Sequence, residues 1–247
     1  MLLLLLFMAS LLPCGADGGE ISWGREATPH SRPYMASISH SHDGEVKRNC
    51  GGFLVREDFV LTAAHCRERN MSVTLGAHNL NKNEKNQQVI PVFQAFLHKS
   101  YSLLKRDNDI MLLKLRYKAR LTSAVKLISL PSREDWEKPG QVCSVAGWGR
   151  TSNGRYPSKL REVELQVQAG EKCQRLFRYF NASTQLCVGS PGDRKCAGAG
   201  DSGGPLVCGN VAKGIVSYGL EEPERPPEVF TKVSSYLDWI DRIMNVS

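Results

Sequence analysis

The sequence lacks several features that would place the protein in other classes. Beyond residues 2–12, no stretch approaches the roughly 20 apolar residues of a membrane-spanning helix, so we expect no membrane span in the mature chain. No Cys-x-x-Cys pair occurs, and His40-x-His42 stands in a polar, Gly-containing stretch, so we expect no metal and no other cofactor. Nucleic-acid recognition motifs, internal repeats and low-complexity segments are also missing, so we expect no nucleic-acid partner.

The apolar run at residues 2–12 has no Lys or Arg before it, so only the α-amino group supplies the positive end of a signal peptide. The run is about half as long as a membrane-spanning segment. Pro13, Cys14 and small residues follow it. We therefore interpret residues 1–18 as a secretory signal peptide and expect a secreted protein. The remainder has the length of one all-β unit and enough apolar residues for a core.

Positive charge exceeds negative charge, and the formal net charge of the chain is +7. Residues 1–20 contain two acids and no Lys or Arg, so their removal raises the net charge to +9. A folded protein with that charge attracts polyanions without a dedicated site. The basic residues are not clustered, so a solvated surface and a polyanion-binding surface both stay open. They include Lys82, Lys85, Lys99, Lys105, Arg106, Lys114, Arg116, Lys118 and Arg120.

Short apolar, β-branched runs recur at close intervals, with Gly, Pro, Asn and Asp between them. This rhythm predicts an all-β barrel or sandwich. The C-terminus departs from the rhythm, because after Ser234 and Ser235 the apolar residues follow a three-four spacing that predicts an amphipathic helix. The predicted strands cover residues 46–60, 73–75, 89–96, 110–115, 142–148, 163–167, 205–216 and 229–233.

One serine motif carries the most information about chemistry. Ser202 follows Asp201 and stands between glycines, and its small neighbours let a substrate carbonyl approach the hydroxyl and the adjacent backbone N–H groups. Upstream, His65 follows the β-like run 59–61, and Asp109 directly precedes another apolar run. His, Asp and Ser in this order form one of the known sequence orders of the nucleophilic triad.

The chain resembles the chymotrypsin-like serine proteases over nearly everything from Ile21 to its C-terminus. Within that family it is most similar to the granule proteases of leukocytes and mast cells: granzymes, cathepsin G and chymases. The resemblance implies a serine endopeptidase that is stored in secretory or cytolytic granules and cuts proteins and peptides. The implied partners are sulfated proteoglycan, serpin inhibitors and an activating dipeptidyl peptidase. The segments that carry the closer likeness are Pro29–Ala36, Cys50–Val55, Thr74–Asn79, Val145–Gly149 and Gly214–Gly219.

The resemblance also implies a fold. The expected architecture is all-β, with two packed six-stranded antiparallel β-barrels and a C-terminal α-helix that packs on the second barrel. The protease domain would occupy residues 21–245, and the chain would cross between the barrels near residues 119–131. The catalytic cleft is expected between the barrels.

The roles of the triad follow from the same resemblance. Ser202 is expected as the nucleophile, His65 as its base and Asp109 as the buried acid that orients His65. Asp107 is the alternative acid, but Asp109 directly precedes the apolar strand. The backbone N–H groups of Gly200 and Ser202 are expected to form the oxyanion hole.

Activation is expected to depend on a new N-terminus. Residues 19–20 resemble the two-residue propeptide of the granule group, which a dipeptidyl peptidase removes. The freed α-amino group of Ile21 would then pair with the carboxylate of Asp201, and breaking such a buried pair costs about 3–5 kcal/mol. The sequence departs from the family pattern at Ser22 and Trp23, where a second Ile or Val and then Gly are usual. The fit of this segment stays open.

Seven cysteines remain after Cys14 leaves with the signal peptide. Cys196 is the odd one, and it is either a buried free thiol or a site of intermolecular pairing. Asn70 and Asn181 start candidate glycosylation sequons, and a third starts at Asn245 near the end of the chain. The resemblance implies three disulfides: Cys50 with Cys66, Cys143 with Cys208, and Cys173 with Cys187.

The specificity pocket is expected from the same resemblance. Cys196 occupies the floor position where a strict Lys/Arg protease has Asp. Glu228 aligns with a wall position, where it could receive Lys or Arg and leave room for an aromatic side chain; the alternative is a solvent-facing Glu on an acidic loop. We therefore expect cleavage after bulky apolar residues, with some tolerance of Lys. The expected substrate-binding residues are Cys196, Ala197, Ser217, Tyr218, Gly219 and Glu228, with 217–219 pairing to substrate as an added strand.

Two functions remain open at this stage. The first is an endopeptidase that forms an acyl-enzyme on Ser202, in immune or mast cells. The second is a catalytically weak or inactive granule protein that binds polyanions or microbial surfaces. The presence of all three triad residues favours the first. The positive charge and the unusual stretches at residues 21–23 and 196–199 motivate the second.

Overall fold

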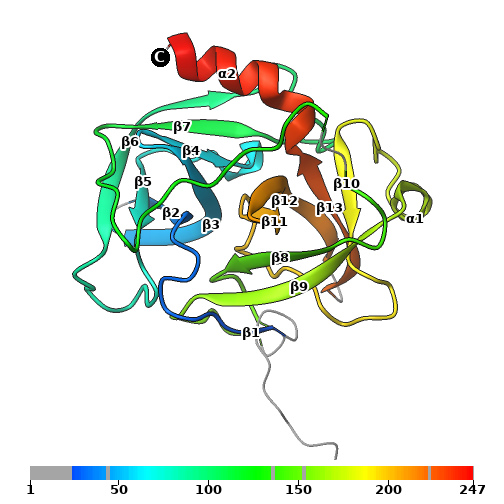
Figure 1. Ribbon diagram of the computed structural model, residues 1–247, viewed down its shortest axis with the longest axis horizontal. Helices are drawn as coiled ribbons and strands as arrows, with labels where there is room; N and C mark the ends of the chain where they lie inside the picture. The colour runs from blue at the N-terminus through cyan, green and yellow to red at the C-terminus, as the bar shows by residue number, and fades with distance from the viewer. Residues whose placement is uncertain (1–23, 43–44, 135–136, 152–153, 222–223, 247) are drawn as a thin grey trace, which may run out of the picture.

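In the computed structural model, which describes residues 24–42, 45–134, 137–151, 154–221 and 224–246, two β-barrels lie beside each other (Figure 1). The first barrel is closed in the strand order β2-β3-β4-β7-β6-β5, and its pairs are antiparallel. Its strands are β2 (Met35–His42), β3 (Glu45–Arg56), β4 (Phe59–Thr62), β5 (Met71–Leu75), β6 (Gln88–Leu97) and β7 (Met111–Leu115).

The second barrel has the strand order β9-β10-β13-β12-β11-β8, and the β8–β9 pairing closes it. The short β1 (Arg25–Glu26) adds to β9 as an extra strand. Apart from the C-terminal helix, which is described below, the helical segments are α1 (Gly170–Leu176) and the 3₁₀ turns η1 (Ala64–Cys66) and η2 (Val233–Tyr236). The strands of this barrel are β8 (Val142–Gly147), β9 (Arg161–Gln168), β10 (Gln185–Val188), β11 (Pro205–Cys208), β12 (Val211–Glu221) and β13 (Glu224–Lys232).

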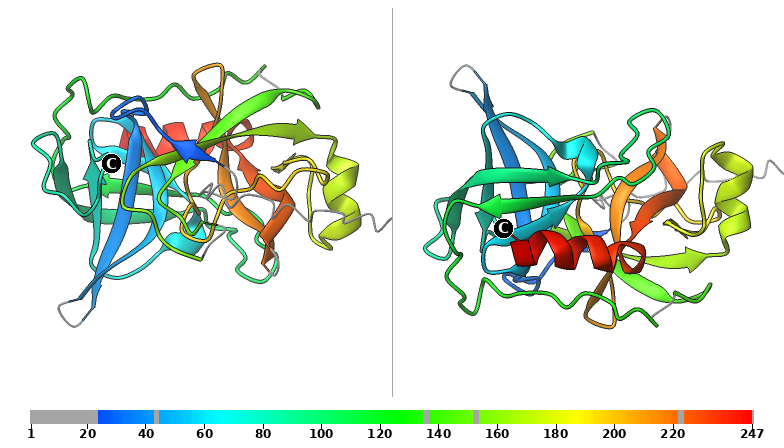
Figure 2. Two further views of the ribbon diagram at one scale, coloured as in Figure 1. Left: turned by 90° about the horizontal axis from the view of Figure 1, so that it is seen from below. Right: turned by 90° about the horizontal axis from the view of Figure 1, so that it is seen from above.

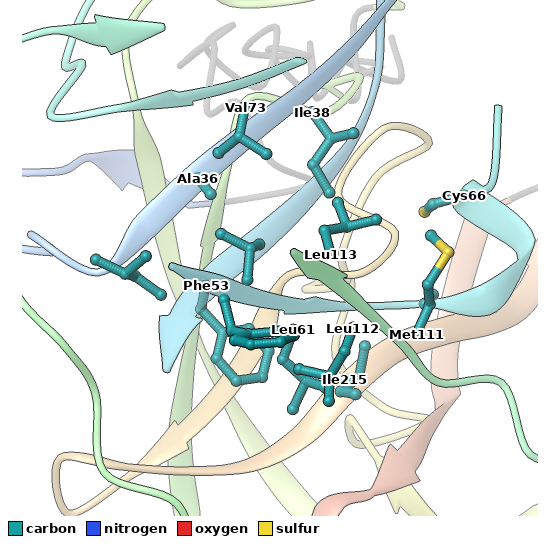
Figure 3. Packing of buried hydrophobic residues seen from close by; sticks show 14 of the residues in the cluster. Ala36, Ile38, Phe53, Leu61, Cys66, Val73, Met111, Leu112, Leu113 and Ile215 are labelled. Atoms are coloured by element: carbon teal, nitrogen blue, oxygen red, sulfur yellow. The ribbon is translucent and has the colours of Figure 1, made fainter. Parts of the chain in front are cut away.

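The core of the first barrel extends to the boundary with the second. Phe53, Leu61 and Leu112 are fully buried in it, and Ile215 of β12 belongs to the same apolar cluster (Figure 3). Burial of a Leu, Ile or Phe side chain contributes about 1.5–3 kcal/mol. This shared cluster therefore holds the two barrels in a fixed relation, which a site built from both requires.

The predicted C-terminal helix is present as α2 (Leu237–Val246), which runs along the outside of the molecule (Figure 2). The expectation that it packs on the second barrel is wrong. Its fully buried Ile240 joins the cluster that fills mainly the first barrel, and Arg56 of β3 donates a hydrogen bond to the Met244 carbonyl. Among the described residues, no helix combines the length and hydrophobicity needed to cross a membrane.

The predicted two-barrel fold is confirmed, while some strand limits differ. The predicted strand 46–60 is two strands, because a turn at residues 57–58 separates β3 from β4. Likewise 205–216 is a hairpin of β11 and β12, whose turn residues Gly209 and Asn210 both have positive φ, as a tight hairpin requires. Residues 116–141 link the barrels, and Ser129 pairs with Val211 of the second barrel.

Candidate active site

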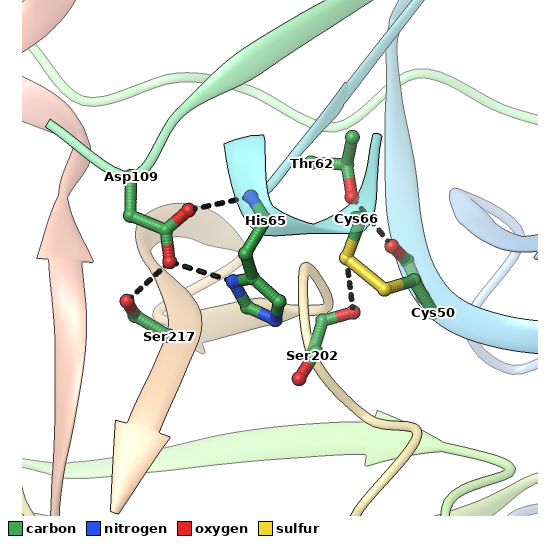
Figure 4. Close-up of a disulfide and its surroundings, with 8 residues drawn as sticks. Cys50, Thr62, His65, Cys66, Asp109, Ser202 and Ser217 are labelled. Atoms are coloured by element: carbon green, nitrogen blue, oxygen red, sulfur yellow. Dashed lines mark hydrogen bonds and ion pairs between the residues drawn. A yellow bond between two sulfur atoms is a disulfide. The ribbon is translucent and has the colours of Figure 1, made fainter. Parts of the chain in front are cut away.

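The three predicted catalytic residues come from distant parts of the chain. His65 lies in η1 just after β4, Asp109 lies just before β7, and Ser202 lies in the loop before β11. Strands β4 and β7 pair so that Thr62 faces Met111, which brings His65 and Asp109 together at the end of the first barrel. The loop of Ser202 approaches from the second barrel. Figure 4 shows the His65 imidazole between Asp109 and Ser202.

Two contacts fix His65 on Asp109. The His65 backbone N–H donates to Asp109 Oδ1 at 2.9 Å, and Nδ1 lies 2.7 Å from Oδ2. Burial raises the pKa of the Asp109 carboxyl, but the hydrogen bonds from His65 and Ser217 outweigh burial and hold the pKa below its ordinary value. The ionised acid therefore favours the tautomer with the proton on Nδ1, which leaves the Nε2 lone pair for Ser202.

The second barrel also holds Asp109. Ser217 Oγ donates to Asp109 Oδ2 at 2.5 Å, and Thr231 Oγ1 donates to the Asp109 carbonyl at 2.8 Å. The alternative acid, Asp107, uses its Oδ1 elsewhere: it accepts the Asn108 backbone N–H at 3.0 Å and the Thr184 hydroxyl at 3.4 Å. Of the two candidates, Asp109 is therefore the acid that contacts His65.

The loop of Ser202 is held against the first barrel. The Ser202 carbonyl accepts a hydrogen bond from the Gly51 backbone N–H at 2.8 Å. The next residue, Gly203, has a φ of +82°, and a Cβ atom there would lie 2.1 Å from Thr62 Oγ1. Only glycine fits at this place, so the glycine after the serine serves the close approach of the two barrels at the nucleophile.

The peptide before the nucleophile is oriented by Arg150, whose backbone N–H donates to the Ala199 carbonyl at 2.6 Å. In a trans peptide the N–H points away from the carbonyl, so the Gly200 N–H points away from Arg150. Within the described part of the chain, neither the Gly200 N–H nor the Ser202 N–H has a hydrogen-bond partner. Both donors are available for an oxyanion.

The carboxylate of Asp201 is fully buried. Its Oδ1 accepts the Gly149 backbone N–H at 2.7 Å, and its Oδ2 accepts the Gly198 backbone N–H at 2.8 Å. These contacts tie Asp201 to the loops beside the predicted oxyanion hole. The predicted partner Ile21, the signal peptide and residues 19–20 lie outside the described residues.

His65 and Ser202 line one cavity of about 300 Å³. Five of the predicted substrate-binding residues also line it, namely Ala197, Ser217, Tyr218, Gly219 and Glu228. The alternative of a solvent-facing Glu228 is wrong, because this residue is buried and its Oε2 accepts the Ala197 backbone N–H at 2.8 Å. The cavity thus has an acid in its wall that can meet a cationic side chain.

Cys196 differs from the expectation for the pocket floor. It is buried but is not among the residues that line the cavity. Six lining residues were not predicted: Arg106, Arg150, Gly198, Ala199, Val216 and Leu220. Adjacency along the chain was the available signal for all but Arg106: Arg150 follows the segment Val145–Gly149, Val216 and Leu220 flank 217–219, and residues 198–199 follow Ala197.

The cysteine and asparagine predictions can be located in the structure. Cys50–Cys66, Cys143–Cys208 and Cys173–Cys187 form disulfides, and Cys196 takes part in none of them. Cys50, Cys66 and His65 bring three metal-ligating atoms within 4.8 Å of one another, but the two sulfurs are bonded to each other, so no thiolate is present there. Asn70 and Asn181 are exposed.

Comparison with known proteins agrees with this geometry. Residues 21–240 match the protein-family model described as Trypsin. The chain belongs to the trypsin family of serine endopeptidases. Granzyme-like protein 2 of Rattus norvegicus is 51% identical over 246 residues, which cover 100% of this chain and 98% of that protein. Cathepsin G of Homo sapiens is 52% identical over 241 residues, which cover 98% of this chain and 94% of that protein.

The fold of the trypsin-family chain is also similar to solved structures. The structure described as "Structure of GrC" has a TM-score of 0.85 and 47% sequence identity, and the match covers 90% of this chain and 98% of that one. The predicted resemblance to granule serine proteases is therefore confirmed.

Proposed function

We propose that the processed protein is a secreted, granule-stored serine endopeptidase that cuts peptide bonds through an acyl-enzyme on Ser202. The observation that carries this proposal is the arrangement of His65: its Nδ1 lies 2.7 Å from the buried Asp109 carboxylate, and its ring lies between that acid and Ser202 (Figure 4). A hydroxyl beside an oriented imidazole is an activated nucleophile.

In the proposed reaction, Ser202 Oγ attacks the scissile carbonyl carbon and passes its proton to His65 Nε2. The negative oxygen that forms binds to the Gly200 and Ser202 N–H groups, and losing one such donor costs about 3–4 kcal/mol. The imidazolium, stabilised by ionised Asp109, then donates the proton to the leaving amine, and the acyl group stays on Ser202. A water molecule then attacks the acyl group in the same way, with His65 as the base, and the carboxylic acid product leaves Ser202.

The pocket supports a mixed primary specificity. Ala197 and Gly219 leave space for a large side chain, and Glu228 places a carboxylate in the wall of the same cavity. We propose cleavage after bulky apolar residues and also after Lys.

Activation would begin with removal of residues 1–18 as a signal peptide and residues 19–20 by a dipeptidyl peptidase, which leaves a protease domain at residues 21–245. The new α-amino group of Ile21 would then pair with Asp201. Burial of this carboxylate supports the proposal, because a buried charge is stable only when it is compensated.

The charge of the surface and the similarity to granule proteases support a proposal for storage and regulation. The net charge of the chain and its exposed basic residues support binding to sulfated proteoglycan. Two of the scattered basic residues have other roles, since Lys114 pairs with Asp58 and Arg106 lines the cavity. Exposed Asn70 and Asn181 are proposed glycan sites, and serpins are proposed inhibitors.

The test is to trim the secreted protein to Ile21 and treat it with a fluorophosphonate probe and a mixed peptide library. We expect labelling at Ser202 and cleavage after Phe, Leu and Lys. The Ser202→Ala variant should lose both signals and keep its affinity for a heparin column. If trimmed protein neither labels nor cuts while it still binds heparin, the non-catalytic binding protein would be the better description.

A further inference from the structure

The side chain of Arg106 is a cation in the cleft, and none of the acids that the structure describes is its partner. Arg106 lies in the loop between β6 and β7 and lines the cavity together with His65, Ser217 and Tyr218. Its Nη1 atom is buried and has no hydrogen-bond partner among the described residues, and no carboxylate of those residues forms an ion pair with it. A buried donor of a charged group without an acceptor is unfavourable.

The position of Arg106 is fixed by its own backbone. Its φ is +52°, in the left-handed region that arginine rarely adopts, and its carbonyl accepts a hydrogen bond from Gln185 Nε2 at 3.1 Å. The contact comes from β10 of the second barrel, so both barrels hold the backbone from which this side chain extends. The planar guanidinium loses less entropy per hydrogen bond to a ligand than a lysine ammonium does.

The groups around Arg106 do not balance its charge. Burial raises the pKa of Tyr101, and nearby Asp109 raises it too, while the charge of Arg106 and its side-chain interaction with the hydroxyl offset part of the increase. The Tyr101 hydroxyl is thus a neutral neighbour that cannot balance the charge of Arg106. The Asp109 carboxylate is engaged by His65 and Ser217. The Asp107 carboxylate accepts from Asn108 and Thr184.

The path of a bound peptide leads past this cation. Beyond Ile215, β12 pairs with β13 and no longer with β11, so residues 217–219 have an open edge for an extended substrate. Side chains of an extended peptide alternate between two faces. If the scissile residue points into the cavity at Ala197 and Glu228, the side chain before it points the other way, toward His65 and Arg106.

We propose that Arg106 makes the enzyme selective for Asp or Glu at the residue immediately before the scissile residue, through a charge-assisted hydrogen bond to that carboxylate. The proposal rests on the proposed endopeptidase activity. The preferred sequence is then an acid followed by a bulky apolar residue or Lys, so that Arg106 and Glu228 select opposite charges at adjacent positions.

The test uses three peptides with Phe at the scissile position and Asp, Asn or Lys before it, so that the charge of Glu228 does not enter the comparison. Enzyme concentration is set by titration with the fluorophosphonate, which counts only folded, active sites. We expect kcat/KM for the Asp peptide to exceed that for the isosteric Asn peptide by at least about fivefold at low salt, less at high salt. The Lys peptide should be the poorest.

Variants then assign the effect to one side chain. Arg106→Gln should bring the ratio of kcat/KM for the Asp peptide over that for the Asn peptide close to one. Arg106→Lys should keep part of the preference for the Asp peptide. Arg116→Gln, which removes the same charge from an exposed site just after the end of β7, should keep the wild-type ratio. An active enzyme with a ratio near one, or an Arg106→Gln variant with an unchanged ratio, would overturn this inference and leave the endopeptidase proposal standing. Absence of both labelling and cleavage in wild type would overturn both.

Discussion

The Ser217 hydroxyl donates a 2.5 Å hydrogen bond to the Asp109 carboxylate across the boundary between the two barrels. Hydrogen bonds to charged groups contribute about 1.5–3 kcal/mol. We expect Ser217→Ala to lower kcat/KM about tenfold and to reduce the free energy of unfolding, because Asp109 would lose a buried donor. Steady-state kinetics and urea unfolding would check this. Ser235→Ala removes an exposed hydroxyl bonded to the Ser183 carbonyl and should change neither by much.

The choice between two neighbouring acids is open to a direct test. Asp109→Asn should lower kcat about 10⁴-fold, the size that this change has in the Ser-His-Asp template, because the amide favours the wrong imidazole tautomer. Asp107→Asn should retain most activity, since that carboxylate contacts Thr184 rather than His65. Equal losses in the two variants would count against the assigned role of Asp109.

The acid in the pocket wall should decide between charged and aromatic substrates. Glu228→Gln keeps an oxygen that can accept the Ala197 N–H, so the local fold should persist. We expect the ratio of kcat/KM for Lys over Phe substrates to fall about 10- to 100-fold, because a charge-assisted contact becomes a neutral one. An unchanged ratio would mean that Glu228 does not meet the substrate side chain.

The surroundings of Asp201 leave no room for an added methyl group. A Cβ atom on Gly149 would lie 2.5 Å from the Asp201 carboxyl carbon. Gly149→Ala should therefore displace this carboxylate and lower kcat/KM about 100-fold or more, the scale of breaking a buried charge pair. Gly192→Ala is the matched control, because a Cβ there meets nothing within 4 Å. Rates normalised to fluorophosphonate labelling would show whether the active fraction or the turnover changes.

One ion-pair cluster should control stability in acid. Burial raises the pKa of Asp58, but hydrogen bonds from Arg56 and Lys114 outweigh it and lower the pKa from 3.8 to about 2. A depressed folded-state pKa stabilises the fold above pH 3.8, and this contribution disappears as the pH falls to about 2. Asp58→Asn should cost about 1–2 kcal/mol at pH 6, after allowance for solvent screening, and progressively less below pH 4. Denaturant unfolding at several pH values would measure it, and a constant difference would contradict the linkage.

Much of the fold could be predicted from sequence because its strands carry strong apolar runs. The run at residues 110–113 gave β7, which is buried almost throughout. Strand β2 was missed, since five of its eight residues are Ser or His. Its stability comes from pairing with β3 and β5 on both sides, which no local pattern records.

The features of the site likewise differ in whether a local sequence pattern could predict them. His65, Asp109 and Ser202 stand in recognisable local motifs, so their neighbourhood could be expected. The hydrogen bond from Ser217 to Asp109 and the placement of Arg106 in the cavity depend on how loops from two barrels meet. The burial of Glu228 is likewise a tertiary property, and the sequence left it undecided.

Each barrel closes on itself through its own strand pairs. Arg106 borders the cavity from a loop outside those strands, so closure of the barrels does not depend on its side chain. Evolution can change which peptide bonds are cut by substituting a few side chains of this kind, while both barrels keep their fold. In a scaffold of this kind, a change of substrate specificity therefore carries little risk to the fold.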